Sequence, residues 1–83
     1  MDMDTRISVI SILVEDPEAV GKVNDLLHDC AQWIRGRMGL PCREKGVNVI
    51  CVVIDAPMDV TSALSGRLGM LRGVSAKTIS SRY

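Results

Sequence analysis

The segment VNVICVVID, residues 47–55, decides the fold. Its centre, residues 49–54, is an unbroken run of β-branched side chains interrupted only by Cys51. The run is too short for an ordinary helix, and β-branched residues favour a pleated strand. Alternate positions place apolar side chains on both faces, which is typical of a strand in the middle of a sheet. We therefore predict a central strand with both faces shielded from water.

The sequence indicates three further strands, two before this segment and one after it. Residues 6–14, RISVISILV, show the same two-faced apolar pattern and are predicted to lie beside it. Residues 34–40 alternate in polarity but contain two glycines and precede Pro41, which favours the edge of a sheet. Residues 74–80, VSAKTIS, are half polar and suit the opposite edge.

Two helices are predicted between these strands. Asp16 is a good N-cap, Pro17 suits the first helical position, and apolar residues then recur at helical spacing as far as Trp33. A second helix follows Pro57. Right-handed crossovers place the first and third strands in the centre of the sheet. We predict an α+β fold, a ferredoxin-like βαββαβ sandwich with a four-stranded antiparallel sheet and two helices on one face.

Length and charge narrow the possible environments and partners. The 83 residues predict one domain, 1–83. Lysine plus arginine and aspartate plus glutamate each number 10, so no net field attracts nucleic acid or an anionic membrane. The acidic start does not resemble a signal peptide, and no apolar run approaches the ~20 residues that span a bilayer. We expect a cytoplasmic protein with no direct nucleic-acid or membrane partner.

The cysteines do not form a metal-binding pattern. There are three, without C-x-x-C spacing, and the chain has a single histidine, His28. We therefore predict free thiols, no metal and no cofactor. Cys51, in the central strand, is predicted to be buried and slow to react, whereas Cys42, in a connection, should react first. No residue pattern forms a reaction centre, so an enzyme is not expected.

Association is indicated by the apolar sheet face that two helices on the other face cannot cover. We predict a homo-oligomer, either a dimer or a tetramer. The second helix also carries a surface of small residues, and a glycine inside a helix costs about 1 kcal/mol relative to alanine. That surface indicates close approach by another backbone. The predicted interface residues are Val9, Ile10, Ile50, Val52, Val53, Ser62, Gly66 and Gly69.

Two arginines in the edge strand are the strongest candidates for binding. Arg35 and Arg37 are two positions apart, so they are predicted to project from one face with their bases about 7 Å apart. They could keep the sheet edge soluble. Alternatively they could clamp a small anion or a carboxylate, because a guanidinium binds such groups with two parallel hydrogen bonds. Both interpretations are open at this point.

Several short motifs resemble a known superfamily. The Asp16-Pro17 turn and the segment LGMLRGV, residues 68–74, resemble the D-x-P and L-x-G-V features of ACT-like regulatory domains. The blocks RGRMGLP, residues 35–41, and SALSGRLG, residues 62–69, are similar to those of a small stand-alone family of proposed regulators of the iron-only hydrogenase system. This second resemblance extends over essentially the whole chain.

The resemblance implies an ACT-like fold and a regulatory, non-catalytic role. Glu18 stands where amino-acid-binding ACT domains usually carry glycine, and His28 alone cannot supply the nickel site of the related repressor domains. Two functions stay open. The chain could sense a small anionic or amino-acid-like effector, with Asp16, Glu18, Arg35 and Arg37 as the candidate ligand-binding residues. It could instead bind a maturation or transcription partner through the small-residue helix surface, with no small molecule.

Overall fold

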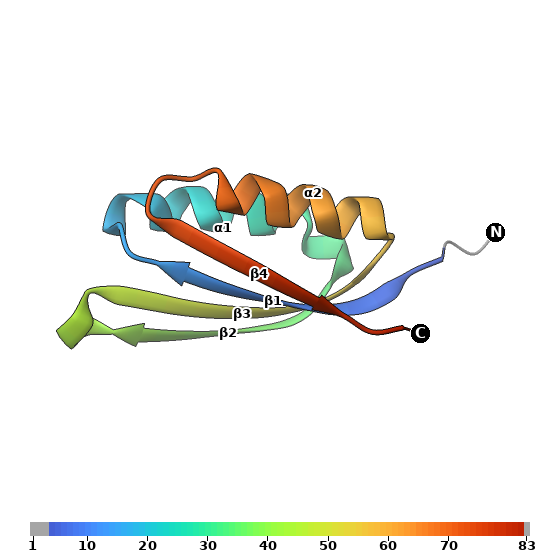
Figure 1. The fold of residues 1–83 in the computed structure, drawn as a ribbon, viewed down its shortest axis with the longest axis horizontal. Helices are drawn as coiled ribbons and strands as arrows, with labels where there is room; N and C mark the ends of the chain where they lie inside the picture. The colour runs from blue at the N-terminus through green and yellow to red at the C-terminus, as the bar shows by residue number, and fades with distance from the viewer. Residues whose placement is uncertain (1–3, 83) are drawn as a thin grey trace.

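The computed structural model describes residues 4–82. Four antiparallel strands form one sheet in the order β2-β3-β1-β4, and two helices cover one of its faces (Figure 1). The strands are β1 (Arg6–Val14), β2 (Ile34–Cys42), β3 (Val47–Ala56) and β4 (Val74–Ser80), and the helices are α1 (Val20–Asp29) and α2 (Met58–Gly69). The predicted βαββαβ order and the central position of β1 and β3 are confirmed.

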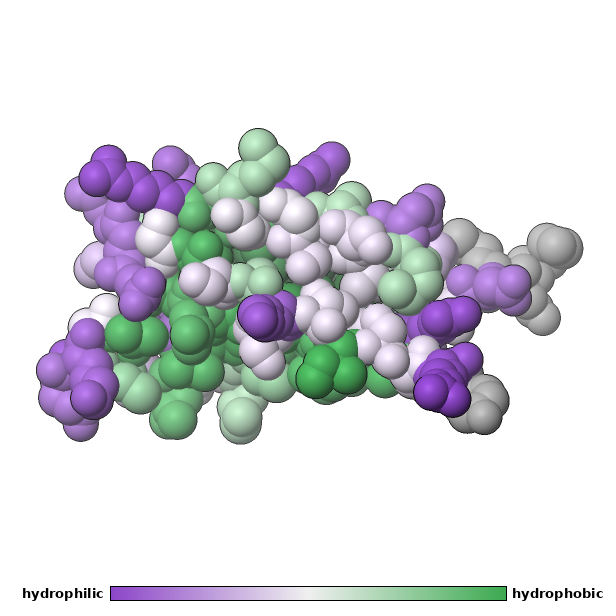
Figure 2. Space-filling view, in the orientation of Figure 1, coloured by the Kyte–Doolittle hydropathy of each residue, from purple (hydrophilic) through white to green (hydrophobic). Residues whose placement is uncertain are grey.

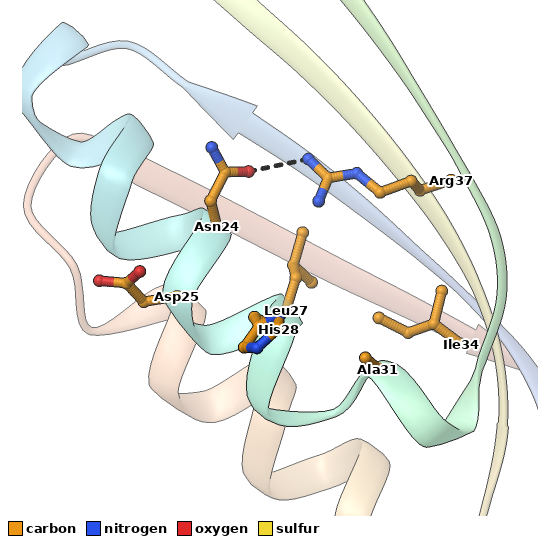
Figure 3. Close-up of a pocket in the computed structure, with 7 residues that line it drawn as sticks. All are labelled: Asn24, Asp25, Leu27, His28, Ala31, Ile34 and Arg37. Atoms are coloured by element: carbon orange, nitrogen blue, oxygen red, sulfur yellow. Dashed lines mark hydrogen bonds between the residues drawn. The ribbon is translucent and has the colours of Figure 1, made fainter.

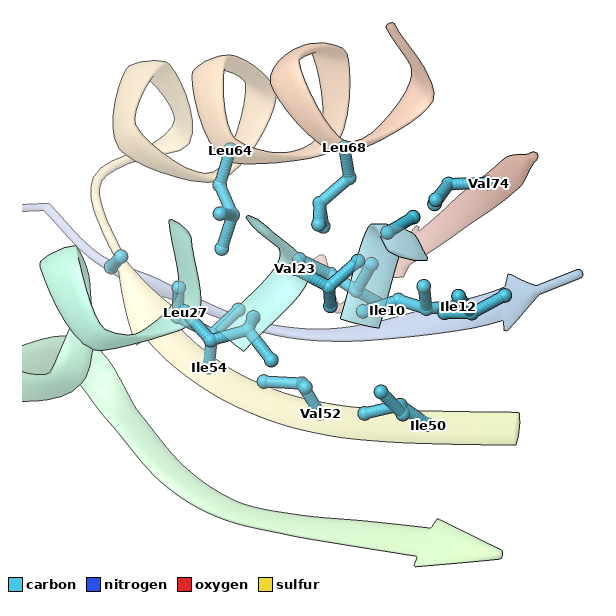
Figure 4. Close-up of a cluster of buried hydrophobic side chains, with 13 residues drawn as sticks. Ile10, Ile12, Val23, Leu27, Ile50, Val52, Ile54, Leu64, Leu68 and Val74 are labelled. Carbon is cyan, nitrogen blue, oxygen red and sulfur yellow. The ribbon is translucent and has the colours of Figure 1, made fainter. Parts of the chain in front are cut away.

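The core lies between the sheet and the helices (Figure 4). The even-numbered residues of β1 from Ser8 and of β3 from Ile50 point into it, as expected for a strand whose side chains alternate between faces. Each large apolar side chain buried here contributes about 1.5–3 kcal/mol to folding. The buried apolar residues are Ile10, Ile12, Val14, Ala19, Val23, Leu27, Ile50, Val52, Ile54, Ala56, Leu64, Leu68 and Val74.

Three residues predicted to form an oligomer interface belong to this core instead. Ile10, Ile50 and Val52 are 0%, 6% and 0% exposed because they point toward the helices. Their assignment to an interface was wrong. Val9 and Val53 pair with each other and point to the opposite face of the sheet, where both are half-buried.

Neither helix of residues 4–82 covers the opposite face of the sheet (Figure 1). We call it the open face. Among residues 4–82, seven large hydrophobic side chains are exposed, and five of them lie on the open face. The exposed apolar surface of the molecule is therefore concentrated on this face. These five are Ile7, Leu13, Met38, Leu40 and Ile79. Cys51 also lies on this face and is only half-buried, so the prediction of a fully buried Cys51 is wrong for the single chain.

A close contact joins the β1–α1 turn to the segment before β4. The Asp16 side chain accepts a hydrogen bond from the Glu18 amide (3.0 Å), and the Glu15 amide donates to the Gly73 carbonyl (2.7 Å). Gly73 has φ = 76°, and a Cβ atom there would lie 2.6 Å from the Asp16 Cβ. Both observations require glycine, and they connect the two motifs that resemble ACT-like domains.

The edge strand β2 contains an irregularity that the sequence pattern concealed. Its register with β3 shifts between Ile34 and Gly36, so that Arg35 is an extra residue in β2. Arg37 consequently pairs with Val52 and shares the face covered by the helices. The prediction that Arg35 and Arg37 project from one face is wrong, because the bulge changes the alternation between them.

The first predicted helix is interrupted at both ends. Residues 17–33 were predicted to be continuous, but α1 is flanked by 3₁₀ turns at Pro17–Ala19 and Ala31–Trp33, with Cys30 between α1 and the second turn. The second turn leads the chain directly into β2. No helix within residues 4–82 has the length and hydrophobicity needed to cross a membrane.

Candidate functional site

A groove between α1 and the start of β2 is the best candidate for binding a small molecule (Figure 3). Its volume is about 480 Å³, and polar side chains from α1 and β2 face each other across it. Leu27 and Ile34 supply its apolar part. The lining residues are Asn24, Asp25, Leu27, His28, Ala31, Ile34 and Arg37.

Arg37 reaches this groove because of the bulge in β2. Its Nη2 donates a 2.9 Å hydrogen bond to Oδ1 of Asn24 across the groove (Figure 3). A guanidinium has five N–H donors, and this contact uses one of them. Both side chains are exposed, so a ligand could share the remaining donors of Arg37 without unfolding any element.

Arg35 lies in a different environment. Its Nη2 is 3.4 Å from Oδ2 of Asp55 in β3, and the side chains are 70% and 22% exposed. An ion pair so open to water contributes little to stability. An exposed, charged Arg35 at the bulge is compatible with the interpretation that it keeps the sheet edge soluble. A clamp formed by both arginines is not present in one chain.

Asp16 and Glu18 are not part of the α1–β2 groove. They line a smaller cleft of about 220 Å³ at the start of α1, together with Lys22 and Arg72. The Asp16 carboxylate caps the turn at Pro17–Ala19, which gives it a structural role. Of the four predicted ligand residues, only Arg37 lies in the larger groove.

Within residues 4–82, no group of three or more His, Cys, Asp and Glu side chains is placed to hold a metal ion. The three thiols are free and half-buried. Partial burial raises the pKa of the Cys30 thiol; the neighbouring Asp29 carboxylate raises it further, and the Arg67 guanidinium opposes both.

The raised pKa of Cys30 predicts slow alkylation near neutral pH. Thiolate is the reactive form, so at pH 8 Cys30 should react more slowly than a small free thiol, and its rate should keep rising above pH 9. Replacing Arg67 with alanine should slow it further, because the Arg67 guanidinium favours the thiolate. Mass spectrometry of pulse-alkylated protein measures each rate. An unchanged rate in Arg67→Ala would contradict this electrostatic explanation.

A second groove runs between α2 and β4. Thr78 in β4 donates a 3.0 Å hydrogen bond to Ser65 in α2, and the Ser8 and Ser80 hydroxyls lie 2.7 Å apart. The groove measures about 350 Å³, and every residue that lines it is uncharged. Figure 2 views this side and shows a pale area of weakly polar residues over α2 and β4. The lining residues are Met58, Thr61, Ser62, Ser65, Gly66, Thr78 and Ser80.

Two of the three small residues predicted on α2, Ser62 and Gly66, line this groove. Ser62, Gly66 and Gly69 are exposed, and a Cβ atom added at either glycine would meet no described atom within 4 Å outside its own stretch of helix. Packing inside one chain therefore does not explain why these two positions are glycine.

The sequence has a recognisable family pattern. Residues 6–78 match the family named TM1266-like, described as "Iron-only hydrogenase system regulator, putative". The chain belongs to this family. The match includes all of β1, β2 and β3, both helices, and most of β4. It therefore covers the α1–β2 groove and nearly all of the open face.

Two solved structures share the fold of this chain. The structure of the uncharacterized protein TM1266 from Thermotoga maritima is 36% identical to this chain and covers 93% of it and 98% of its own length, with a TM-score of 0.89. The C-terminal domain of the MgtC protein from Mycobacterium tuberculosis is 12% identical and covers 100% of this chain and 95% of its own, with a TM-score of 0.74. The predicted ACT-like fold is confirmed. A search of curated proteins finds no match.

Sequence reasoning missed the partners of both arginines. Asn24 was not considered because nothing in the alternation of residues 34–40 places Arg37 on the helix side of the sheet. Asp55 was read as the end of a strand, and its pairing with Arg35 depends on the same bulge. The two glycines of residues 34–40 and the adjacent Pro41 indicated an irregular edge, but not the position of the extra residue.

Proposed function

We propose that this chain is a regulatory module of the iron-only hydrogenase system that works as a homo-oligomer assembled through its open face. The observation that carries the proposal is the concentration of exposed apolar side chains on that face. Patches of this kind on small soluble domains mark sites of association. The link to hydrogenase comes from the description of the family to which the chain belongs.

A second copy of the chain is the partner that fits this face best. Four strands spaced about 4.8 Å apart and about nine residues long give the sheet a footprint of roughly 19 by 30 Å. Because the side chains make this surface uneven, its accessible area is larger than the flat footprint. It approaches the ~800 Å² that each partner buries in a standard interface. Positive and negative side chains are equal in number at 10 each, so two copies do not repel one another.

The sensing part of the proposal concerns the α1–β2 groove. We infer that it takes a small ligand bearing a carboxylate or similar anion, with Arg37 as the binding group. The planar guanidinium can hold such a group with two parallel hydrogen bonds, and Asn24 fixes its position. Arg35, paired with Asp55, takes no part.

A thermal-shift screen against amino acids, small carboxylates, phosphate and nucleotides tests this inference. A ligand at 100 times its Kd adds about 2.7 kcal/mol of stability, which raises the Tm of a domain of this size by about 10 °C or more. Replacing Arg37 with lysine should remove most of that shift, because lysine lacks the planar fork. Arg35→Lys is the matched control and should retain it.

Two outcomes would contradict the sensing inference. One is the absence of any shift with every compound, which would leave protein association as the whole function. The other is an equal loss of the shift in Arg35→Lys and Arg37→Lys, which would show that the arginines act together or only through the fold.

A further inference from the structure

The two edges of the sheet differ in how well they are protected against pairing with another strand. The β2 edge has a bulge, two glycines, two arginines and Pro41, all of which hinder strand addition. The β4 edge has none of these features: Val74–Ser80 pairs with β1 in an unbroken register, and its one charged residue is Lys77. Within residues 4–82, β4 pairs with β1 alone.

The hydrogen-bonding pattern identifies the backbone groups that β4 presents outward. The Ser81 amide donates to the Ile7 carbonyl (2.8 Å), directly after β4. Since such bonds recur at every second residue of an antiparallel pair, Ile79 and Lys77 also direct their backbone groups toward β1. The N–H and C=O groups of Ala76, Thr78 and Ser80 therefore point away from the sheet.

We propose that β4 pairs with β4 of a second copy about a two-fold axis at Thr78, which joins two sheets into one of eight strands. In this register Thr78 faces its own counterpart, and Ala76 faces Ser80 of the other copy. All of the paired groups are those that point outward. A register centred on Lys77 would place two ammonium groups side by side, which like-charge repulsion disfavours.

The same register also suits the side chains on the open face. Lys77 of one copy would lie opposite Ile79 of the other, so that its methylene groups would cover a side chain that is 77% exposed in the single chain. The two lysines would be kept apart. Every residue that β4 contributes to the pairing is therefore neutral, or is placed beside an apolar neighbour.

The small residues of α2 favour a second copy at this edge. Because α2 lies beside β4, the two-fold axis brings α2 of each copy next to the other, and Ser62, Gly66 and Gly69 permit their backbones to approach closely. Among residues 4–82, nothing outside their own turns of helix lies within 4 Å of where a Cβ atom at either glycine would stand. Thr61, which is 1% exposed, also lines the α2–β4 groove, and its hydroxyl oxygen has no hydrogen-bond partner among the described residues.

This interface pairs the backbone of the β4 edge, whereas the open-face interface packs one sheet against another. Although Ile79 lies at both, a change to the β4 backbone can break one interface without the other. Two interfaces that are each two-fold and mutually perpendicular close a tetramer. At 9.0 kDa per chain, four copies give 4 × 9.0, or about 36 kDa. A variant that loses one interface should form dimers, and a variant that loses both should be monomeric.

Replacing Thr78 with proline tests the edge directly. The change removes an outward N–H that β1 does not use, so the chain should still fold, as circular dichroism can verify. Both bonds at the two-fold axis are lost, and the edge should bind roughly 100-fold more weakly, since proline also blocks the partner strand. Sedimentation should show half the wild-type mass. Thr78→Val, which keeps the N–H, is the matched control and should retain the wild-type mass.

A cross-linking experiment tests the register without relying on stability. A hydrogen-bonded pair of residues in an antiparallel ladder has Cα atoms about 5.5 Å apart, within the range of a disulfide. Thr78→Cys should therefore form a disulfide with its own counterpart under mild oxidation, detected as a linked pair of tryptic peptides spanning residues 78–82. Ser80→Cys, on the same strand and face, should not, because its opposite residue is Ala76. Absence of the Thr78→Cys link, or equal linking by both variants, would overturn the proposal.

Discussion

Replacing Gly73 with alanine should destabilise the fold by about 3 kcal/mol or more. A left-handed conformation costs an L-residue roughly 1–2 kcal/mol. The new Cβ would in addition lie 2.6 Å from the Asp16 Cβ, so the turn would have to move away from the backbone that it contacts. That movement would weaken the hydrogen bond from the Glu15 amide to the Gly73 carbonyl. Urea denaturation measures the loss.

Gly46→Ala is the matched control for this prediction. Gly46 also has a positive φ, 67°, but nothing lies within 4 Å of the position that its Cβ would occupy. Its cost should be limited to the backbone conformation, about 1 kcal/mol. Similar free energies of unfolding for the two variants would show that the contact between Gly73 and Asp16 has no importance for stability.

Replacing Val53 with aspartate should separate copies that meet at the open face while leaving each chain folded. Val53 lies between Val9 on β1 and Gly36 on β2, on the face away from the helices. An unpaired carboxylate buried at an interface costs several kcal/mol, which corresponds to a loss of about 1,000-fold or more in affinity. Cys51, two residues away on the same face, should then alkylate several-fold faster.

Val52→Asp distinguishes the two faces of the same strand. Val52 is 0% exposed beneath the helices, so a charge there should unfold the chain rather than separate copies. Circular dichroism and sedimentation together resolve the two effects. A folded Val52→Asp protein, or an unfolded Val53→Asp protein, would reverse the assignment of the faces.

The order of elements could be read from the sequence because β-branched runs and helical periodicity are local signals. The sequence does not indicate which side of the sheet the helices cover. Val9 and Ile10 are both apolar and β-branched, so no local property says which of them points toward α1 and α2. Only the way in which each chain segment enters and leaves the sheet decides this, and that depends on packing across the whole domain.

The arginines illustrate a second limit. A strand with strict alternation would place Arg35 and Arg37 together, whereas one extra residue sends them to different faces. The position of a bulge depends on the fit between β2 and β3, to which residues far apart in sequence contribute. Gly73 contacts a turn 57 positions earlier in the chain (73 − 16), and no local pattern around Gly73 indicates that contact.

The most direct test of the open face as a self-association surface is sedimentation equilibrium of the wild-type protein and Val53→Asp at micromolar concentration. We expect the wild type to have a mass well above the 9.0 kDa of one chain, and Val53→Asp to have half of the wild-type mass with an unchanged circular dichroism spectrum. A wild type that stays at 9.0 kDa across this range, or a Val53→Asp protein with the wild-type mass, would contradict the account.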